Sequence, residues 1–295
     1  MSDSQCVVFL QWALPRLRMR WAGFRKVRRQ VCRRVWRRAR ELGLADLVAY
    51  RAYLEEHPVT RITISRFYRD RGVFGFLEQE VLPMLAAEAV ACDSGTLELW
   101  SAGCASGEEP YTVALIWQLE LTQRFSDLSI QILATDLDQT MLTRARRACF
   151  TTSSLKELPE HWRTAAFLQQ GALHCVRDHY KQAVMVARHD IRTPPPHGPF
   201  DLVMCRNLAF TYFDRDLQRA TGARLADVLR PGGALVLGGH EALPKDLHGF
   251  EPWSAPHRVY RRVGNSTPHV RDSGEPGSSS TLTDESPCDP TSPTR

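Results

Sequence analysis

The chain has 295 residues, of which 43% are hydrophobic and 24% charged, and its formal net charge is +5. This length fits one large domain plus a smaller one, with the composition of a globular protein. No apolar run approaches the roughly 18 residues of a membrane span, and the apolar stretch 6–14 lacks the preceding basic residues of a signal peptide. The eight scattered cysteines have no metal-ligand spacing, so we expect no metal site and reduced thiols in a cytoplasmic protein. We also expect a monomer.

Residues 1–91 are expected to form a basic helical domain. Apolar residues recur at near-helical spacing between 42 and 54, Pro58 ends that run, and a second helix is expected over 75–91. The segment 16–40 contains twelve Arg or Lys and no acid. Such a segment attracts acidic protein surfaces or nucleic acid, although many charge runs are solvated faces without a partner. We favour an acidic protein partner and do not expect nucleic acid.

From residue 97 the pattern predicts strands that alternate with helices. The expected strands are 97–102, 130–135, 184–188, 200–205, 234–238 and 258–263, and the helices between them are 109–121, 139–147 and 216–229. This alternation favours a mostly parallel α/β sheet with its ligand beyond the carboxyl ends of the strands. The sheet domain is expected over 92–263, and the residues 264–295, rich in Ser, Thr, Pro and Gly, are expected to form a disordered tail.

The first expected strand ends in a turn that contains Gly103 and Gly107 and leads into Glu108 and Glu109. Glycines let the backbone turn sharply and approach a ligand, whereas the two acids would repel a phosphate. The turn therefore suits S-adenosylmethionine (SAM), which has no phosphate and carries a cationic amine and a sulfonium. The alternative is that the acids only complement the dipole of the helix that follows.

The next strands also end in polar residues. Asp136, at the end of the second strand, can accept hydrogen bonds from ribose hydroxyls, and Asp138 is expected to cap the following helix. The strand 200–205 runs into Arg206 and Asn207, which have no packing role at a strand end and are expected to belong to a site.

Five segments together resemble the CheR-type methyltransferases, which modify glutamate side chains of bacterial chemoreceptors. In chain order they read TISRFYRD, SAGCASGEEPYT, ILATDLD, FDLVMCRNLAFTYFD and LRPGGALVLGGHEAL. The resemblance covers residues 24–263. It implies a class I SAM-dependent methyltransferase (Rossmann-like) sheet, a substrate-facing N-terminal helical domain, and a short inserted β-subdomain at about 161–186.

The resemblance also implies site residues. Those expected to bind SAM are Thr63, Ser65, Arg69, Gly103, Glu109, Asp136, Asp190, Ile191, Asn207 and Leu208. Glu109 is expected at the methionine part, Asp136 at the ribose, and Asp190 with Ile191 at the adenine.

Arg69 and Tyr212 are the expected catalytic residues. Arg69 would orient the substrate carboxylate, and its alternative role is an ordinary ion pair with Asp70 or Glu78. Tyr212 follows Asn207 by one residue more than the family spacing.

A carboxylate is already ionised at neutral pH, so its methylation needs positioning rather than a general base. We therefore expect methylation of glutamates on an acidic, chemoreceptor-like protein that binds the basic residues 16–40. The alternatives are a small-molecule or other protein acceptor, and a SAM-binding regulator without turnover. Base methylation is not expected, because the Asn/Asp-Pro-Pro-aromatic loop of amino-directed nucleic-acid methyltransferases is replaced here by residues 206–209.

Overall fold

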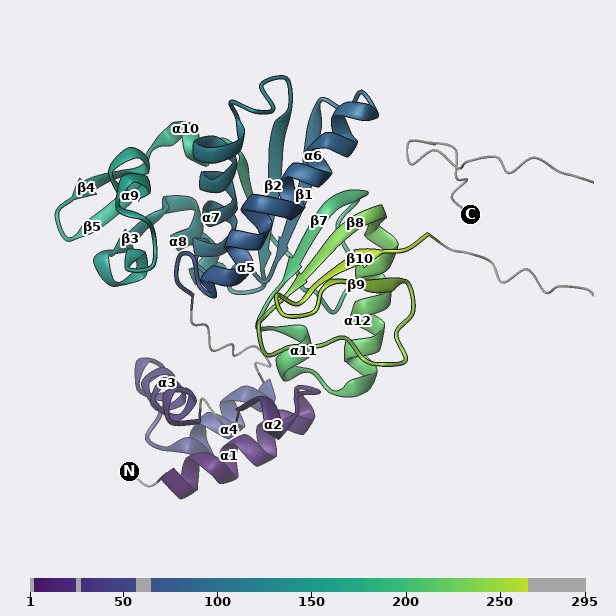
Figure 1. The fold of residues 1–295 in the computed structure, drawn as a ribbon. Helices are drawn as coiled ribbons and strands as arrows, with labels where there is room; N and C mark the ends of the chain where they lie inside the picture. The colour runs from purple at the N-terminus through teal and green to yellow at the C-terminus, as the bar shows by residue number, and fades with distance from the viewer. Residues whose placement is uncertain (1–2, 25–27, 57–64, 265–295) are drawn as a thin grey trace, which may run out of the picture.

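A seven-stranded sheet forms the centre of the chain in the computed structural model, which describes residues 3–24, 28–56 and 65–264 (Figure 1). Thr63 and the tail expected over 264–295, apart from its first residue, lie outside these ranges. The strands of the sheet are β1 Thr96–Ala102, β2 Ser129–Asp136, β6 Val184–Arg188, β7 Phe200–Cys205, β8 Leu229–Leu237, β9 Phe250–Ser254 and β10 Val259–Arg262.

The strand order is β6-β2-β1-β7-β8-β10-β9, and the first five of these strands are parallel. Strand β10 runs antiparallel to both of its neighbours. The chain moves outward in opposite directions from β1 and β7, so the switch point of this open sheet lies between them. This topology confirms the predicted class I, Rossmann-like fold. The sequence did not predict β9, whose residues FEPWS include a Pro and a Glu and form a weak strand pattern.

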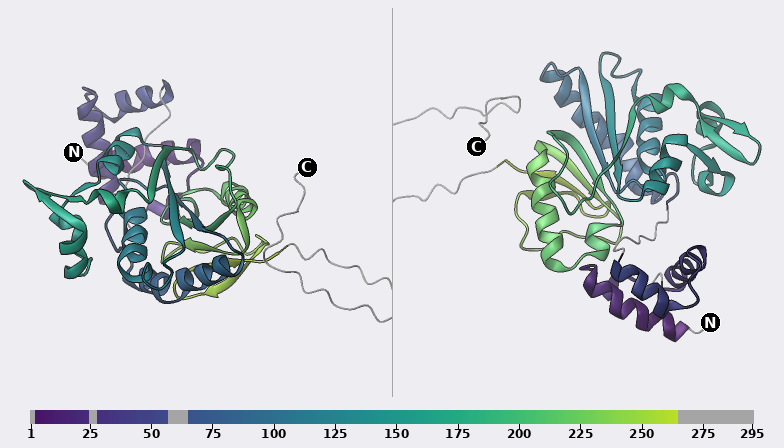
Figure 2. Two further views of the ribbon diagram at one scale, coloured as in Figure 1. Left: turned by 90° about the horizontal axis from the view of Figure 1, so that it is seen from above. Right: turned by 180° about the vertical axis from the view of Figure 1, so that it is seen from behind.

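Helices cover both faces of the sheet, as Figures 1 and 2 show. The helices α6 Leu82–Ala91 and α7 Glu108–Ile116 pack on one face, and α12 Arg215–Val228 packs on the other. All six residues of β7 are buried, as expected for a central strand with helices on both sides. The shorter helical segments are α5 Arg71–Phe76, η1 Leu77–Val81, η2 Trp117–Leu121, α8 Gln139–Arg147, η3 Thr152–Leu155, α9 Glu160–Ala166, α10 Asp178–Lys181 and α11 Ala209–Tyr212.

A second, three-stranded antiparallel sheet is inserted after α8. Its order is β3-β5-β4, with β3 Cys149–Thr151, β4 Phe167–Gln170 and β5 Leu173–Val176. It lies on the side of the molecule away from α12 (Figure 2). This subdomain therefore covers about 149–176 and starts earlier than the expected 161. The three residues of β3 are too few for a periodic pattern, and they become a strand by pairing with β5.

The N-terminal domain consists of α1 Asp3–Arg16, α2 Trp21–Phe24, α3 Arg28–Glu41 and α4 Leu47–Glu56. These helices share an apolar core of their own, to which Leu10, Val31 and Tyr50 belong. The helices α5 and α6 pack into the core of the sheet instead. The division between the domains is thus earlier than the expected residue 91. Across the described ranges, no helix has the length and apolar sequence that crossing a membrane requires.

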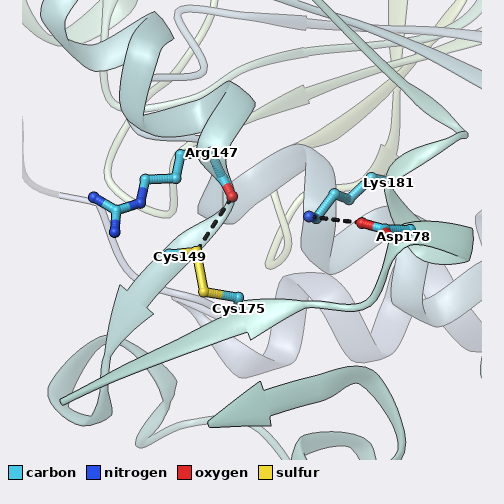
Figure 3. The surroundings of a disulfide bond; sticks show 5 residues. All are labelled: Arg147, Cys149, Cys175, Asp178 and Lys181. Carbon is cyan, nitrogen blue, oxygen red and sulfur yellow. Dashed lines mark hydrogen bonds and ion pairs between the residues drawn. A yellow bond between two sulfur atoms is a disulfide. The ribbon is translucent and has the colours of Figure 1, made fainter. Parts of the chain in front are cut away.

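Two disulfides join cysteines that both lie within the described ranges, where the sequence suggested reduced thiols. One joins Cys6 of α1 to Cys32 of α3, and the other joins Cys149 of β3 to Cys175 of β5. Figure 3 shows the second, which bridges two directly opposite residues of the small sheet. Each pair is separated by 26 positions. Cysteines so far apart in sequence form no local pattern, and only the fold brings them together.

Candidate active site

A cleft lies between the N-terminal domain and the carboxyl ends of β1, β2 and β7, and we call it the interdomain cleft. Eight of the predicted site residues line it: Ser65, Arg69, Gly103, Glu109, Asp136, Asn207, Leu208 and Tyr212. Its opposite wall consists of apolar side chains of α1, α3 and α4, including Leu10, Leu14 and Val31. The structure therefore brings together residues that are up to 147 positions apart, from Ser65 to Tyr212.

The turn after β1 has the backbone conformation that its glycines predict. Gly103 has φ 83° and Gly107 has φ 95°, both in the left-handed region that glycine adopts readily. A Cβ on Gly103 would lie 2.3 Å from Cδ2 of Leu208, so a larger residue would displace the Leu208 side chain. The N–H groups of Gly103 and Cys104 both donate to the carbonyl of Thr135 at 2.8 Å, which fixes the turn to the end of β2.

Asp136 and Asp138 have different contacts, and those of Asp138 confirm its predicted role as a helix cap. Asp138 accepts the N–H groups of Thr140 and Met141, at 2.8 and 3.2 Å, and so caps α8. Asp136 is 4% exposed and accepts the N–H groups of Ala105 and Asp138, each at 3.0 Å. A carboxylate has about four acceptor positions. That capacity is what two backbone N–H groups and a pair of ribose hydroxyls require together.

Glu109 lies in the first turn of α7 and lines the interdomain cleft. Its Oε1 accepts the hydroxyl of Ser101 at 2.9 Å, and its Oε2 accepts Nη1 of Arg206 at 3.2 Å. Burial raises the pKa of the Glu109 carboxyl above its ordinary value, and the Arg206 guanidinium opposes this rise. Glu109 is thus a largely buried acid with Arg206 as its cationic partner. It lines the cleft, and its predicted contact is the methionine part of SAM, which carries a cationic amine.

Arg206 links the end of β7 to two other segments of the site. Besides Glu109, it donates from Nη2 to Oδ2 of Asp70 at 2.8 Å and to the carbonyl of Arg69 at 3.0 Å. Its guanidinium also lies over the ring of Phe74, 4.9 Å from the centroid. The side chain is 2% exposed. The sequence indicated that Arg206 belongs to a site, and the structure gives it the role of holding the Arg69 segment beside α7.

Arg69 points to the end of β7. Its Nη2 donates to Oδ1 of Asn207 at 3.3 Å. The two acids considered as its ion-pair partners have other contacts, since Asp70 pairs with Arg206 and Glu78 accepts the hydroxyl of Tyr68 at 3.3 Å. Arg69 lines the interdomain cleft, and its role in the reaction stays a prediction.

Tyr212 also lines the interdomain cleft, despite the extra residue that separates it from Asn207. Its ring packs against Phe24 of the N-terminal domain, with 4.8 Å between the centroids. Burial raises the pKa of Tyr212, and the cationic side chains of Arg69 and Arg34 oppose this rise. Its hydroxyl therefore stays protonated at neutral pH.

Asp190 and Ile191 are not among the residues that line the interdomain cleft. Asp190 forms an ion pair with Arg192 at 2.6 Å, and Ile191 is buried in the core together with Trp100. The segment does lie beside Asp136, because the N–H of His189 donates to the Asp136 carbonyl at 3.1 Å. Their contact with adenine stays a prediction.

The N-terminal domain docks on α11 and on the start of α12 through residues of the basic run. Arg18 forms two hydrogen bonds with Asp214, at 3.0 and 3.1 Å. Arg20 donates from Nη2 to the carbonyl of Phe210 at 2.6 Å and from Nε to that of Thr211 at 3.0 Å. The sequence did not separate these docking arginines from the rest of the run, because charge density alone does not reveal which side chains face the protein.

The remaining arginines of the run lie mainly on α3. Val31, Val35 and Ala39 form its buried face, and the exposed Arg29, Arg33 and Arg37 recur every four residues. Residues four apart share one face of a helix. We call these three residues the α3 basic face. The helix borders the interdomain cleft, since its residues 30, 31 and 35 line the cleft wall.

Comparisons with known proteins concern mainly the sheet domain. A family model described as CheR methyltransferase, SAM binding domain, matches residues 63–259. The chemotaxis protein methyltransferase of Listeria innocua is 36% identical over 182 residues, or 62% of this chain and 66% of that protein. Chemotaxis protein methyltransferase 1 of Pseudomonas aeruginosa is 32% identical over 201 residues, or 65% of this chain and 72% of that protein.

A longer relative matches more of this chain. An uncharacterised 104.1 kDa protein of Rhodobacter capsulatus is 31% identical over 242 residues, which is 79% of this chain and 25% of that protein. The chain thus spans 66% of the length of the Listeria relative and a quarter of the Rhodobacter one.

Proposed function

Because the chain belongs to the CheR methyltransferase family, we propose that it transfers a methyl group from SAM to carboxylate side chains of a protein. The proposed acceptors are glutamates of a chemoreceptor or a related signalling protein. The observation that carries this proposal is the convergence of Arg69, Glu109, Asp136, Asn207 and Tyr212 on one cleft.

The chemistry of the interdomain cleft fits SAM. Glu109 and Asp136 supply two largely buried carboxylates, which suit a cationic amine and a pair of hydroxyls. The missing Cβ of Gly103 lets the Leu208 side chain lie directly against the turn. Arg206 is the most buried cation among the described residues that line this cleft, and it is held by Glu109, Asp70 and the Arg69 carbonyl rather than free to bind a phosphate.

The side chains then have defined tasks in the transfer. SAM, when bound, supplies an electrophilic methyl on its sulfonium. Glu109 would hold the amine, Asp136 the ribose, and Asn207 with Leu208 the methionine part. Arg69 would align the acceptor carboxylate through its guanidinium. The acceptor is ionised at neutral pH, so Tyr212 serves as a neutral hydrogen-bond donor rather than as a base.

The α3 basic face is the proposed contact for an acidic protein substrate. Its three arginines are exposed on α3, on the face opposite to Val31 and Val35, which line the interdomain cleft. Electrostatic attraction of this kind speeds association and weakens with salt. We also propose a monomeric enzyme that acts in the cytoplasm. Mass spectrometry of protein quenched in cells tests this location, because persistent disulfides would indicate an oxidising compartment.

A second candidate is methylation of an apolar small molecule. It is favoured by the apolar wall of the interdomain cleft, where Phe9, Leu10, Leu14 and Val35 face the predicted SAM site. Such walls with a few polar groups are typical of small-molecule sites.

Transfer from methyl-labelled SAM into a fractionated bacterial lysate separates the two candidates. We expect label in the protein fraction that alkali releases as methanol, since carboxyl methyl esters are base-labile. Label in the small-molecule fraction would support the second candidate. Alkali-stable label on protein would contradict carboxylate methylation.

A further inference from the structure

Glu241 is a buried carboxylate behind the loop that follows β7. It lies just after the end of β8 and is 2% exposed. Its Oε2 accepts the N–H groups of Asn207 and Gly238, both at 2.7 Å. Its Oε1 accepts the N–H of Leu208 at 3.1 Å and the hydroxyl of Thr211 at 2.6 Å. About four acceptor positions are available on a carboxylate, so these donors use all of them.

Three of the four donors belong to the segment 207–211, whose backbone is unusual. Asn207 has φ 55°, in the left-handed region that asparagine tolerates better than most residues but does not prefer. Leu208 follows with φ −134° and ψ −94°. This path directs the Asn207 carboxamide to Arg69 and the Leu208 side chain to Gly103. An external acceptor is needed to hold two successive N–H groups in this arrangement.

The end of β8 is shaped to let Glu241 reach this loop. A Cβ on Gly238 would lie 2.9 Å from three atoms, namely Cγ and Oδ1 of Asn207 and Oε2 of Glu241. Glycine at this position therefore allows the side chain of Asn207 and the carboxylate to meet. Glu241 itself does not line the interdomain cleft.

We propose that Glu241 is a positioning residue: it fixes the backbone of Asn207 and Leu208 and, through the Asn207 carboxamide, the guanidinium of Arg69. It acts without touching cofactor or substrate. The inference rests on the proposed function, because Asn207 and Leu208 are the residues proposed to lie beside the methionine part of SAM. It adds a buried acid that fixes the orientation of those two residues toward the cofactor.

Glu241→Gln tests this role, because it keeps the shape of the side chain but replaces one acceptor oxygen with an NH₂ donor. Two measurements are needed. Hydrogen exchange read by mass spectrometry should show faster exchange in peptides that cover 206–212. Calorimetry should show binding of S-adenosylhomocysteine weakened by about tenfold, as when the binding-competent arrangement of Asn207 and Leu208 falls to about a tenth of the molecules.

Asp201→Asn is the matched control. Asp201 is also a buried carboxylate, 6% exposed, which accepts the N–H of Glu98 at 2.7 Å and pairs with Arg230 at 3.0 Å. It lies at the opposite end of β7. This variant should lower the melting temperature, yet leave exchange in 206–212 and cofactor affinity unchanged. A purely structural role of Glu241 would make the two variants alike.

Gly238→Ala disturbs the same contact from β8 and serves if Glu241→Gln does not fold. It should change exchange and affinity in the same direction. Unchanged exchange in 206–212 overturns the inference, and so does faster exchange without weaker binding. If the wild type fails to bind S-adenosylhomocysteine, the proposed function fails, while the exchange experiment still decides whether Glu241 holds the loop.

Discussion

Replacing Asp136 with alanine should weaken binding of S-adenosylhomocysteine by about 10- to 150-fold. The range follows from the loss of hydrogen bonds to a charged group, worth about 1.5–3 kcal/mol, with 1.4 kcal/mol for each tenfold change. The same change should lower stability, because the N–H groups of Ala105 and Asp138 lose their acceptor. That penalty is about 1–3 kcal/mol for each buried group.

Asp138→Ala is the control that separates affinity from stability. It removes the cap of α8, which costs about 0.5–2 kcal/mol, but it keeps the backbone N–H that Asp136 accepts. Isothermal titration calorimetry and thermal melts of both variants should show lower stability for each and weaker binding only for Asp136→Ala. Wild-type affinity in Asp136→Ala, or an equal loss of affinity in Asp138→Ala, would refute the ribose-binding role.

Four further predictions address the reaction, the partner, the acidity of the site and the disulfides. Arg69→Ala should bind S-adenosylhomocysteine within a few-fold of the wild type and lose methyl transfer in a labelled-SAM assay; Arg71→Ala, which removes an exposed pair with Glu157, should stay active. Replacing the three arginines of the α3 basic face with glutamate should slow methylation of a protein substrate at low salt, with a smaller loss at high salt. An unchanged rate at low salt would show that this face is solvated and binds no partner. Cofactor affinity should fall on acidification, because the ionised form of Glu109 holds the amine. The fall should begin at a pH above the ordinary pKa of a glutamate, since burial raises the pKa of Glu109. Binding titrations of Glu109→Gln should lack this pH dependence. In protein oxidised after purification, serine at both Cys149 and Cys175 should lower the free energy of unfolding by about 3.5 kcal/mol in the chain-entropy picture for a 26-residue separation. Equal denaturant curves for the variant and the oxidised wild type would contradict a formed disulfide.

The sequence predicted the parts of the fold that local patterns encode. The mostly apolar sequence of β7 and the capping position of Asp138 follow directly from residue order, and the structure contains both. The pairing of Cys149 with Cys175 and the strand β3 depend on contacts with distant residues, so no local pattern reveals them.

The candidate site shows the same division. Glycines and acids at strand ends identified one side of the interdomain cleft, because parallel strands bring their carboxyl ends to one edge. Arg206 and Glu241 organise that edge, but their partners lie 97 and 34 positions away and cannot be assigned before the fold is known. The split of the basic run into docking residues, such as Arg20, and the α3 basic face likewise depends on the packing of α2 against α11.

A crystal structure of the protein with S-adenosylhomocysteine would test the central claim most directly. The account predicts the ligand in the interdomain cleft, with its ribose hydroxyls on Asp136, its amine beside Glu109, and its sulfur facing Arg69 and Tyr212. A ligand bound elsewhere, or one that lies in this cleft without contacting Asp136 and Glu109, would contradict it.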